Sequence, residues 1–197
     1  EKEHDDEPFS VRSRENLDNK KSIGSLVSNL IQDGDIIMMD SSTTSLEVAK
    51  GLGNSKNITL ITNSMGLSME MVQYDNIQVI CVGGTLRRKS LSFIGPTARE
   101  VIQNYYADKV ILSCKGIDME KGIMESNEME AEVKKAMIDT AKTVILAVDN
   151  TKFGTLSMIR LFDFSKIDIL VTDTRPSEEW MDYFQEMGIK CIISEEK

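Results

Sequence analysis

Short runs rich in Ile and Val alternate along this chain with segments of helical periodicity, and this alternation restricts the fold more than any other feature. The apolar runs show little in-and-out alternation, as is typical of parallel strands covered on both faces. Strands and helices that alternate in this way predict an α/β fold with a doubly wound, mostly parallel sheet. The expected strands span residues 36–39, 58–61, 77–82, 110–112, 144–148, 167–171 and 191–193.

Helical patterns precede the first run and fill most of the intervals between the others. Apolar residues spaced by three and four predict a first helix of about 17 residues that ends at Gly34. In the segment 127–142, Glu130 and Lys134 fall four residues apart on the predicted exposed side, and the predicted inner stripe consists of Met129, Val133, Ala136, Met137 and Thr140. The remaining expected helices span residues 43–53, 64–75, 96–106 and 177–187.

The length of 197 residues suits one domain, or at most two small ones, and we place a single domain at residues 15–197. Residues 1–14 are polar and read as an arm or linker. The chain carries 23 Lys and Arg against 32 Asp and Glu, a formal net charge of −9. This excess of negative charge makes nucleic acid and membrane surfaces poor partners.

Several features indicate a cytoplasmic protein. The charged N-terminal residues carry no signal peptide, and no apolar run approaches the ~18 residues of a membrane span. Cys81, Cys114 and Cys191 each lie in an apolar run, so we expect buried, reduced thiols.

Motifs for cofactors and for nucleophilic catalysis are missing from the sequence. His4 is the only histidine and no CxxC motif occurs, which argues against a zinc site and against a Ser-His or Cys-His catalytic pair. The sequence also has no dinucleotide fingerprint and no phosphate-binding loop of the nucleoside triphosphatase type. We therefore expect no cofactor.

The first expected strand runs directly into Asp40 and then into five consecutive hydroxyl residues at a helix start. Unpaired N–H groups and the helix dipole make such a position a site for phosphate. The alternative is a helix N-cap, in which Ser and Thr are common, but a cap requires one hydroxyl rather than five. The run therefore favours an anion site over a cap.

Loops after the other strands bring further polar residues to the same edge of the sheet. Residues 62–64 lead straight into a helix and would be a cap if they stood alone. Gly83 and Gly84 precede Arg87 and two more cations, which form either a solvated basic turn or a site where Arg87 binds a phosphate or a sugar hydroxyl. Lys115 either binds an anionic substrate or is an ordinary surface lysine, and the sequence favours neither.

Taken in order, these segments resemble the C-terminal domains of DeoR-family transcriptional regulators. The resemblance covers nearly the whole chain and rests on the ordered set rather than on any single motif. The match runs in order from about Glu7-Pro8-Phe9 with Arg12 to the end of the chain, and the further segments that carry it are residues 35–44, 61–64, 83–87, 90–96, 116–118, 130–134 and 149–154.

The resemblance implies a ribose-5-phosphate-isomerase-like fold, of the NagB/RpiA/CoA-transferase-like type. It also implies a sensor domain that binds a phosphorylated sugar or related metabolite and controls, usually as a repressor, a winged helix-turn-helix domain that is missing here. DNA would be bound only through that N-terminal domain, and the protein would form a homo-oligomer, a dimer or tetramer. Carried over residue by residue, the site would consist of Asp40, Ser41, Ser42, Thr43 and Thr44 around the phosphate, and of Thr62, Asn63, Gly84, Arg87, Lys115, Asp118 and Lys152 around the sugar.

Two other functions stay open at this point. A sugar-phosphate isomerase needs a carboxylate base near the sugar, for which Asp118 and Asp149 are the candidates. Lys115 occupies the place of a carboxylate in those isomerases, and a lysine acts as a base at neutral pH only if its pKa falls by several units. The resemblance therefore favours sensing over catalysis. The third function is an oligomerisation module whose pocket is vestigial.

Overall fold

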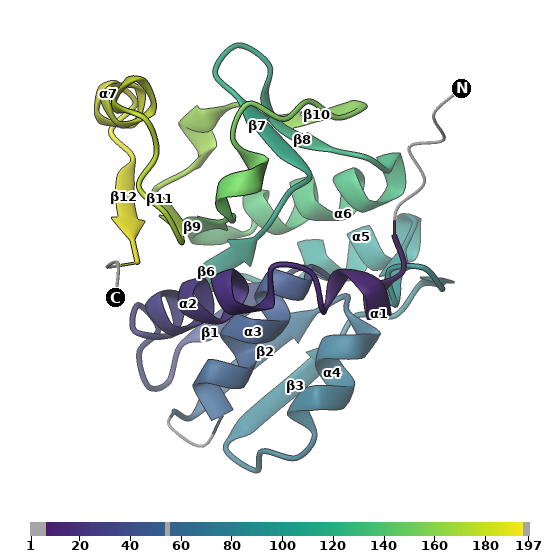
Figure 1. Cartoon of the computed structure of the whole chain (residues 1–197). Helices are drawn as coiled ribbons and strands as arrows, with labels where there is room; N and C mark the ends of the chain where they lie inside the picture. The colour runs from purple at the N-terminus through teal and green to yellow at the C-terminus, as the bar shows by residue number, and fades with distance from the viewer. Residues whose placement is uncertain (1–6, 54–55, 195–197) are drawn as a thin grey trace.

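A seven-stranded parallel sheet forms the centre of the protein in the computed structural model, which describes residues 7–53 and 56–194 (Figure 1). Its strand order is β12-β11-β9-β6-β1-β2-β3, and each neighbouring pair is parallel. All seven apolar runs of the sequence become strands, so the predicted doubly wound sheet is confirmed. The strands are β1 (Ile36–Met39), β2 (Ile58–Thr62), β3 (Ile77–Cys81), β6 (Ala107–Leu112), β9 (Ala141–Ala147), β11 (Ile169–Thr172) and β12 (Lys190–Ile193).

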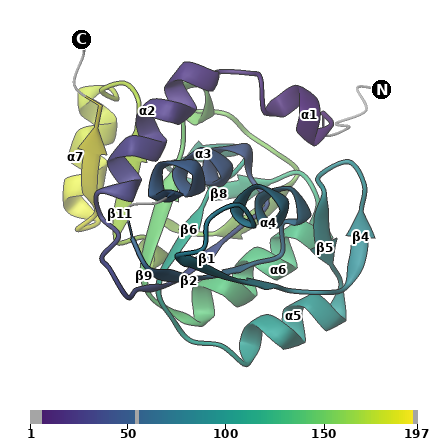
Figure 2. The same ribbon diagram turned by 90° about the horizontal axis from the view of Figure 1, so that it is seen from below.

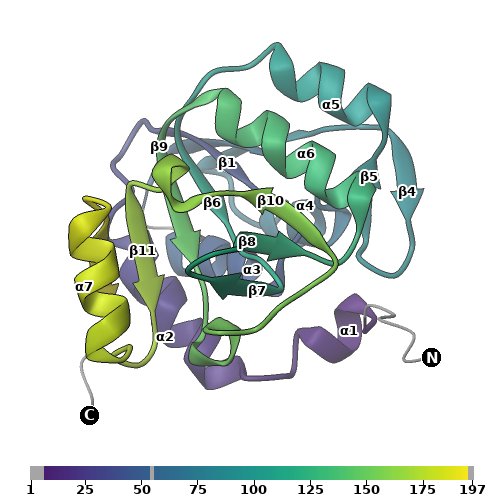
Figure 3. The same cartoon turned by 90° about the horizontal axis from the view of Figure 1, so that it is seen from above.

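Helices cover both faces of this sheet, as Figures 2 and 3 show. One face packs against α2 (Leu17–Ser28), α3 (Thr43–Leu52) and α4 (Met65–Met71), and the other against α5 (Pro96–Gln103), α6 (Glu128–Asp139) and α7 (Glu178–Glu186). Successive strand residues point to opposite faces. Accordingly, Ile37 and Met39 of β1 belong to the apolar core beneath α2, α3 and α4, while Met38 belongs to the core on the other side.

Two small sheets fill the interruptions that the sequence shows after the third and fourth apolar runs. The first is a hairpin of β4 (Thr85–Arg87) and β5 (Ser92–Ile94). The second joins β7 (Gly116–Asp118), β8 (Gly122–Glu125) and β10 (Ile159–Phe162) in the order β10-β8-β7. Because α6 packs against β6 and β9 of the main sheet and also against β8 and β10, this helix is covered on two sides.

The double cover of α6 buries more of that helix than predicted: Val133, Ala136 and Met137 of the predicted inner stripe are buried as expected, but so is part of the opposite side. Glu130 and Lys134 were expected on its exposed side, but both are buried, whereas Met129 of the predicted inner stripe is 55% exposed. The first long helix also differs from the prediction, since α2 ends at Ser28 rather than near Gly34. Among the cysteines, Cys114 is buried but Cys81 is exposed, because Cys81 ends the edge strand β3.

Short helices complete the chain. Residues of the predicted arm form α1 (Phe9–Arg12), and two 3₁₀ helices, η2 (Asn150–Lys152) and η3 (Phe164–Lys166), follow β9 and β10. None of the helices in the described part of the chain is long and apolar enough to cross a membrane.

Gly24 sets how closely α2 approaches α3. A Cβ atom at Gly24 would lie 2.8 Å from both the carbonyl carbon and the carbonyl oxygen of Glu47, closer than real Cβ contacts. The backbones of the two helices are therefore in close contact at Gly24, and any larger residue there would push the helices apart. This contact matters for the site described below, since α2 carries Lys20 and α3 begins within residues 41–45, which we call the hydroxyl-rich loop.

We expect Gly24→Ala to lower the free energy of unfolding by about 1–3 kcal/mol, because the added methyl group meets backbone atoms that cannot rotate away. Urea denaturation monitored by circular dichroism measures the change. Gly51→Ala is the matched control: Gly51 also lies in a helix, but its Cβ would be 3.4 Å from the nearest atom. That variant should be neutral or more stable by up to about 1 kcal/mol. Equal stability of the two variants would contradict the role given to Gly24.

Candidate functional site

The strand order reverses between β1 and β6, and the candidate site lies at the carboxyl ends of these two strands. From β1 the chain continues to β2 on one side, whereas from β6 it continues to β9 on the other. Ligands of open parallel sheets bind in the crevice that such a reversal leaves. Here the two strand ends are joined directly, because the backbone N–H of Ser113 donates a 3.0 Å hydrogen bond to Oδ2 of Asp40.

An open cleft of about 660 Å³ lies above this junction. Its wall includes six cationic side chains and four carboxylates, an excess of positive charge in a chain whose net charge is −9. The lining residues are Arg12, Glu15, Asn16, Lys20, Ser41, Ser42, Thr43, Thr44, Arg87, Ser90, Ser113, Cys114, Lys115, Glu125, Glu130, Lys134, Asp149 and Lys152.

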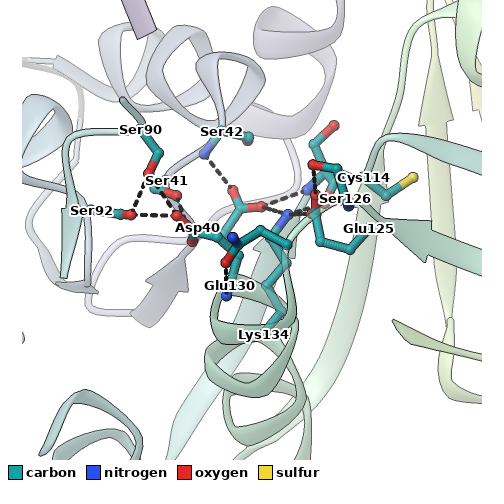
Figure 4. Close-up of polar contacts among 12 residues, drawn as sticks. Asp40, Ser41, Ser42, Ser90, Ser92, Cys114, Glu125, Ser126, Glu130 and Lys134 are labelled. Atoms are coloured by element: carbon teal, nitrogen blue, oxygen red, sulfur yellow. Dashed lines mark hydrogen bonds and ion pairs between the residues drawn. The ribbon is translucent and has the colours of Figure 1, made fainter. Parts of the chain in front are cut away.

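Lys134 of α6 forms the floor of the cleft by binding two buried carboxylates (Figure 4). Its Nζ atom lies 3.1 Å from Oδ2 of Asp40 and 2.5 Å from Oε2 of Glu125, and it donates a 2.8 Å hydrogen bond to the carbonyl oxygen of Ser113. One ammonium group therefore ties together α6 and the ends of β1, β6 and β8.

The ionised forms of this cluster stabilise one another. Burial alone would raise the pKa of Asp40, but the charge of Lys134 and hydrogen bonds from Ser42, Ser45 and Ser113 hold that pKa below its usual value. Burial alone would lower the pKa of Lys134, but Glu125 and Asp40 raise it above its usual value. Lys134 is thus a charged structural residue and cannot serve as a neutral base.

Some side chains of the hydroxyl-rich loop form hydrogen bonds within the protein, whereas others offer donors to the cleft. Ser42 is the N-cap of α3, since its Oγ accepts a 3.0 Å hydrogen bond from the N–H of Ser45. Ser45 in turn donates a 2.6 Å hydrogen bond from its hydroxyl to Asp40. For Thr43 and Thr44, no described residue accepts a hydrogen bond from the backbone N–H groups or the hydroxyls. First-turn N–H groups of a helix have no acceptor within the helix, so these two residues offer donors to the cleft.

Glu130 organises the opposite side of the loop. Its Oε1 accepts hydrogen bonds from Ser90 at 2.7 Å and from Ser92 at 2.5 Å, and its Oε2 accepts a 3.3 Å bond from Ser41. Arg87 of the β4–β5 hairpin approaches the same carboxylate at 3.7 Å and donates to Ser90 at 3.0 Å. Glu130 therefore links the hairpin to the hydroxyl-rich loop.

Lys152 is held at the cleft by its local structure. Asp149 follows β9 and caps η2 by accepting hydrogen bonds from the N–H and the hydroxyl of Thr151. This places Lys152, the last residue of η2, at the cleft wall, where it is half-buried. No described residue forms an ion pair with its ammonium group or accepts a hydrogen bond from it. The charge of Lys152 is therefore available to an anion.

Seven of the twelve residues predicted for the site line this cleft, namely Ser41, Ser42, Thr43, Thr44, Arg87, Lys115 and Lys152. Asp40 lies just beneath them, and both of its carboxylate oxygens are already bonded within the protein. The geometry therefore gives Asp40 a positioning role in place of the predicted place in the phosphate loop.

The other four predicted residues lie outside the cleft, and each is used locally. Thr62 donates from its hydroxyl to the carbonyl of Met39, and Asn63 donates from its amide to the carbonyl of Phe93. Gly84 has φ +149°, and a Cβ there would lie 2.7 Å from the carbonyl oxygen of Ile94. Asp118, a base candidate of the sequence, accepts hydrogen bonds from two N–H groups in the β7–β8 turn and does not line the cleft.

Sequence reasoning missed much of the cleft wall. Glu130 and Lys134 were missed because a single helical stripe was sought on α6, and Glu125 because it ends β8, a short strand that local periodicity does not reveal. Arg12 and Lys20 were missed because they precede the first strand. The available signal was the charge of Glu130 and Lys134 in a segment that already belonged to the resemblance. Among the described residues, no group of three or more His, Cys, Asp and Glu is placed to hold a metal ion.

Comparison with known proteins decides the family. Residues 15–174 match the family described as the DeoR C-terminal sensor domain. The chain belongs to the DeoR family. The resemblance seen in the sequence is thereby confirmed, and so is the assignment of the chain as a sensor domain.

Relatives of this DeoR-family chain are transcriptional regulators. The uncharacterized HTH-type transcriptional regulator YulB of Bacillus subtilis (strain 168) is 39% identical over 84% of this chain and 64% of its own length. The putative aga operon transcriptional repressor of Escherichia coli O157:H7 is 29% identical over 88% of this chain and 65% of its own length. The chain thus spans slightly less than two thirds of these two relatives.

Solved structures confirm the predicted fold of the DeoR-family domain. Ribose 5-phosphate isomerase A from Methanocaldococcus jannaschii superposes with a TM-score of 0.51 at 16% identity, over 70% of this chain and 55% of that one. The eIF2B delta subunit from Chaetomium thermophilum superposes with a TM-score of 0.54 at 12% identity, over 79% of this chain and 60% of that one. At such low identity the likeness concerns the fold alone.

We expect Lys134→Met to lower the free energy of unfolding by about 3–5 kcal/mol, because the buried carboxylates of Asp40 and Glu125 lose their counter-ion. Urea denaturation at neutral pH measures the loss. Lys135→Met is the matched control, since the neighbouring lysine is 41% exposed and forms its ion pair with the half-exposed Glu132. That variant should differ from the wild type by less than about 1 kcal/mol. An equal loss of stability in both variants would refute the conclusion that Lys134 holds the buried carboxylates together.

The stability advantage of the wild type over Lys134→Met should depend on pH at both extremes. Asp40 has a lowered pKa in the folded state, so its contribution is complete above its usual value of 3.8 and is lost as the pH falls below it. Lys134 has a raised pKa, so its contribution is complete below its usual value of 10.5 and is lost as the pH rises above it. Denaturation of both proteins at a series of pH values across this range tests the acidic and the alkaline loss. A stability difference between them that stays constant at all pH values would contradict the assigned pKa shifts.

Proposed function

We propose that the cleft binds the phosphate of a phosphorylated sugar or a closely related metabolite, and that this ligand is the effector of the regulator. The observation that carries the proposal is the pairing of donors at the cleft: Lys152 has no described partner, and the N–H groups of Thr43 and Thr44 face the same space. A helix N-terminus with free N–H groups favours an anion, and a nearby ammonium group adds charge.

The sugar part of the ligand would contact a part of the cleft wall that carries both hydrogen-bond donors and acceptors. Lys115, Ser90 and Asp149 line the cleft beyond the hydroxyl-rich loop, so donors and acceptors are both present for hydroxyl groups. Arg87 is already engaged by Glu130 and Ser90, and we assign it a secondary role beside Lys152. The sequence left Arg87 open between a solvated basic turn and a residue that binds a phosphate or a sugar hydroxyl, and we propose the second.

Sensing is favoured over catalysis by the bonding of the carboxylates in the cleft. Glu125 is bound to Lys134 and Ser126, and Glu130 to three serine hydroxyls, while Asp149 caps η2. Carboxylates held in this way serve to position neighbouring groups, whereas a general base needs an oxygen directed at the substrate proton. We therefore propose a domain without isomerase activity, in agreement with relatives that are named as transcriptional regulators.

In the whole protein, the effector would act by preferring one of two states of the regulator. Several relatives are named HTH-type regulators or repressors, so we propose repression through a DNA-binding domain of that type, acting in the cytoplasm. DNA would be bound through that domain, since the present chain carries a net charge of −9. Assembly into a dimer or tetramer stays a prediction, which sedimentation of the purified chain measures.

The test of the proposed function is thermal unfolding with inorganic phosphate and a panel of pentose and hexose monophosphates, each beside the unphosphorylated sugar. A ligand present at 100 times its dissociation constant stabilises by about 2.7 kcal/mol. For a domain of this size, this corresponds to a rise in Tm of roughly 5–10 °C. We expect such a rise with at least one phosphorylated compound and none with its unphosphorylated sugar.

Lys152→Met should weaken the binding of the stabilising phosphate compound by about 10- to 100-fold, the worth of one hydrogen bond from a charged group. Isothermal titration calorimetry measures the affinity. Lys166→Met is the matched control, since Lys166 also ends a 3₁₀ helix capped by an aspartate but is exposed and does not line the cleft. No shift with any compound would favour an oligomerisation module, and turnover of a sugar phosphate by the purified chain would overturn the sensor assignment.

A further inference from the structure

The segment before α2 forms one wall of the cleft, although it precedes the part of the chain that matches the sensor family. That match begins at residue 15, whereas Arg12 of α1 lines the cleft. Figures 2 and 3 show α1 set apart from the helical layers and joined to α2 by a short connection. We refer to residues 8–16, which comprise α1 and this connection, as the N-terminal segment.

The N-terminal segment is docked on the domain at both ends. At its start, Phe9 packs over α4, where a Cβ on Gly66 would lie 3.0 Å from the phenyl ring. The N–H of Phe9 also donates a 2.7 Å hydrogen bond to the carbonyl of Lys89, in the loop between β4 and β5. The segment thus contacts the same hairpin that carries Arg87 to the cleft.

At its end, the segment is held by a buried ammonium group of the cleft wall. Lys20 of α2 donates hydrogen bonds to the carbonyl oxygens of Arg12 at 2.6 Å and Glu15 at 2.7 Å. Burial lowers the pKa of Lys20, and the charges of Lys152 and Arg12 lower it further, while Asp149 and Glu15 oppose this. Three cations are therefore gathered at this end of the cleft.

Arg12 has donors that no described residue uses and that match an anion. Its Nε donates a 3.0 Å hydrogen bond to the carbonyl of Glu7, and its guanidinium carbon lies 5.9 Å from the centre of the Phe9 ring. No described residue accepts a hydrogen bond from either of its Nη groups. The guanidinium is thus fixed at one edge by the segment itself, while the planar fork of the other nitrogens suits two oxygens of a phosphate.

We propose that Arg12 is a further ligand-binding residue, and that an anion bound in the cleft fixes the N-terminal segment against the domain through it. This inference rests on the proposed function, since it needs the anion that Thr43, Thr44 and Lys152 are proposed to bind. It adds that the ligand joins two parts of the chain: the sheet edge and the segment that leads into the domain. Binding of the ligand in the cleft then holds the N-terminal segment in place without any change in the main sheet.

The experiment compares hydrogen exchange of the full 197-residue chain with and without inorganic phosphate and the pentose and hexose monophosphates of the panel. We expect the stabilising compound to slow exchange both in peptides covering residues 41–46 and in peptides covering the N-terminal segment. In Arg12→Ala, residues 41–46 should stay protected at saturating ligand while protection of the N-terminal segment is lost. The affinity of this variant should fall about 10-fold or more.

Arg14→Ala is the matched control, because Arg14 lies in the same segment but is exposed and does not line the cleft. It should behave as the wild type in both measurements. Arg12→Lys keeps the charge without the planar fork and should bind with intermediate affinity. An unchanged Tm of the three variants without ligand shows that they fold.

The outcomes separate this inference from the proposed function. Protection at residues 41–46 without protection of the N-terminal segment, or equal affinity of Arg12→Ala and the wild type, overturns the role of Arg12 and leaves the cleft as the effector site. A wild-type chain in which no compound protects residues 41–46 overturns the proposed function itself, and the inference falls with it.

Discussion

One buried ammonium group holds together the parts of the chain on which the cleft is built. Lys134 bonds to Asp40 after β1, to the carbonyl of Ser113 after β6 and to Glu125 at the end of β8. A buried charge that loses its partners is costly, so these three segments cannot move apart while the domain stays folded. Asp40 then orients the hydroxyl-rich loop through Ser42 and Ser45. The groups offered to a ligand are therefore carried by a base that these buried ion pairs and hydrogen bonds hold together.

The main sheet was predictable because its signal is local in the sequence. Each strand is a short Ile and Val run, and such runs have few alternatives when helical patterns separate them. The two small sheets could not be predicted in this way. β4 and β5 have three residues each, and long-range contacts position them, such as the hydrogen bonds from Phe93 to Asn63 and from Met65 to Leu91. Segments that depend on contacts between distant residues leave little trace in local periodicity.

For the candidate site, topology predicted the right edge of the sheet but could not assign each side chain. The hydroxyl-rich loop, Lys115 and Lys152 follow strands whose carboxyl ends meet at the cleft. Thr62 and Asn63 follow a strand at the same edge, yet their side chains bond to neighbouring backbone and turn away from the cleft. Lys134 was assigned to solvent because helical periodicity describes one buried face, whereas β8 and β10 cover a second face of α6. Whether a polar side chain bonds to its neighbours or faces the cleft depends on distances in the folded chain, and sequence spacing does not give these distances.

The bond between Ser113 and Asp40 also has a kinetic meaning, since it joins residues 73 positions apart. The chain must close that long loop, at a cost in entropy, before β1 and β6 can pair. The cleft therefore does not exist in early, locally folded states, and no metabolite can act as a template for the assembly of the sheet. Under the proposed function, a bound effector stabilises contacts that form only in the native protein, so it slows unfolding and leaves the rate of refolding unchanged. The concentration of the effector then sets the lifetime of the folded domain rather than its rate of formation.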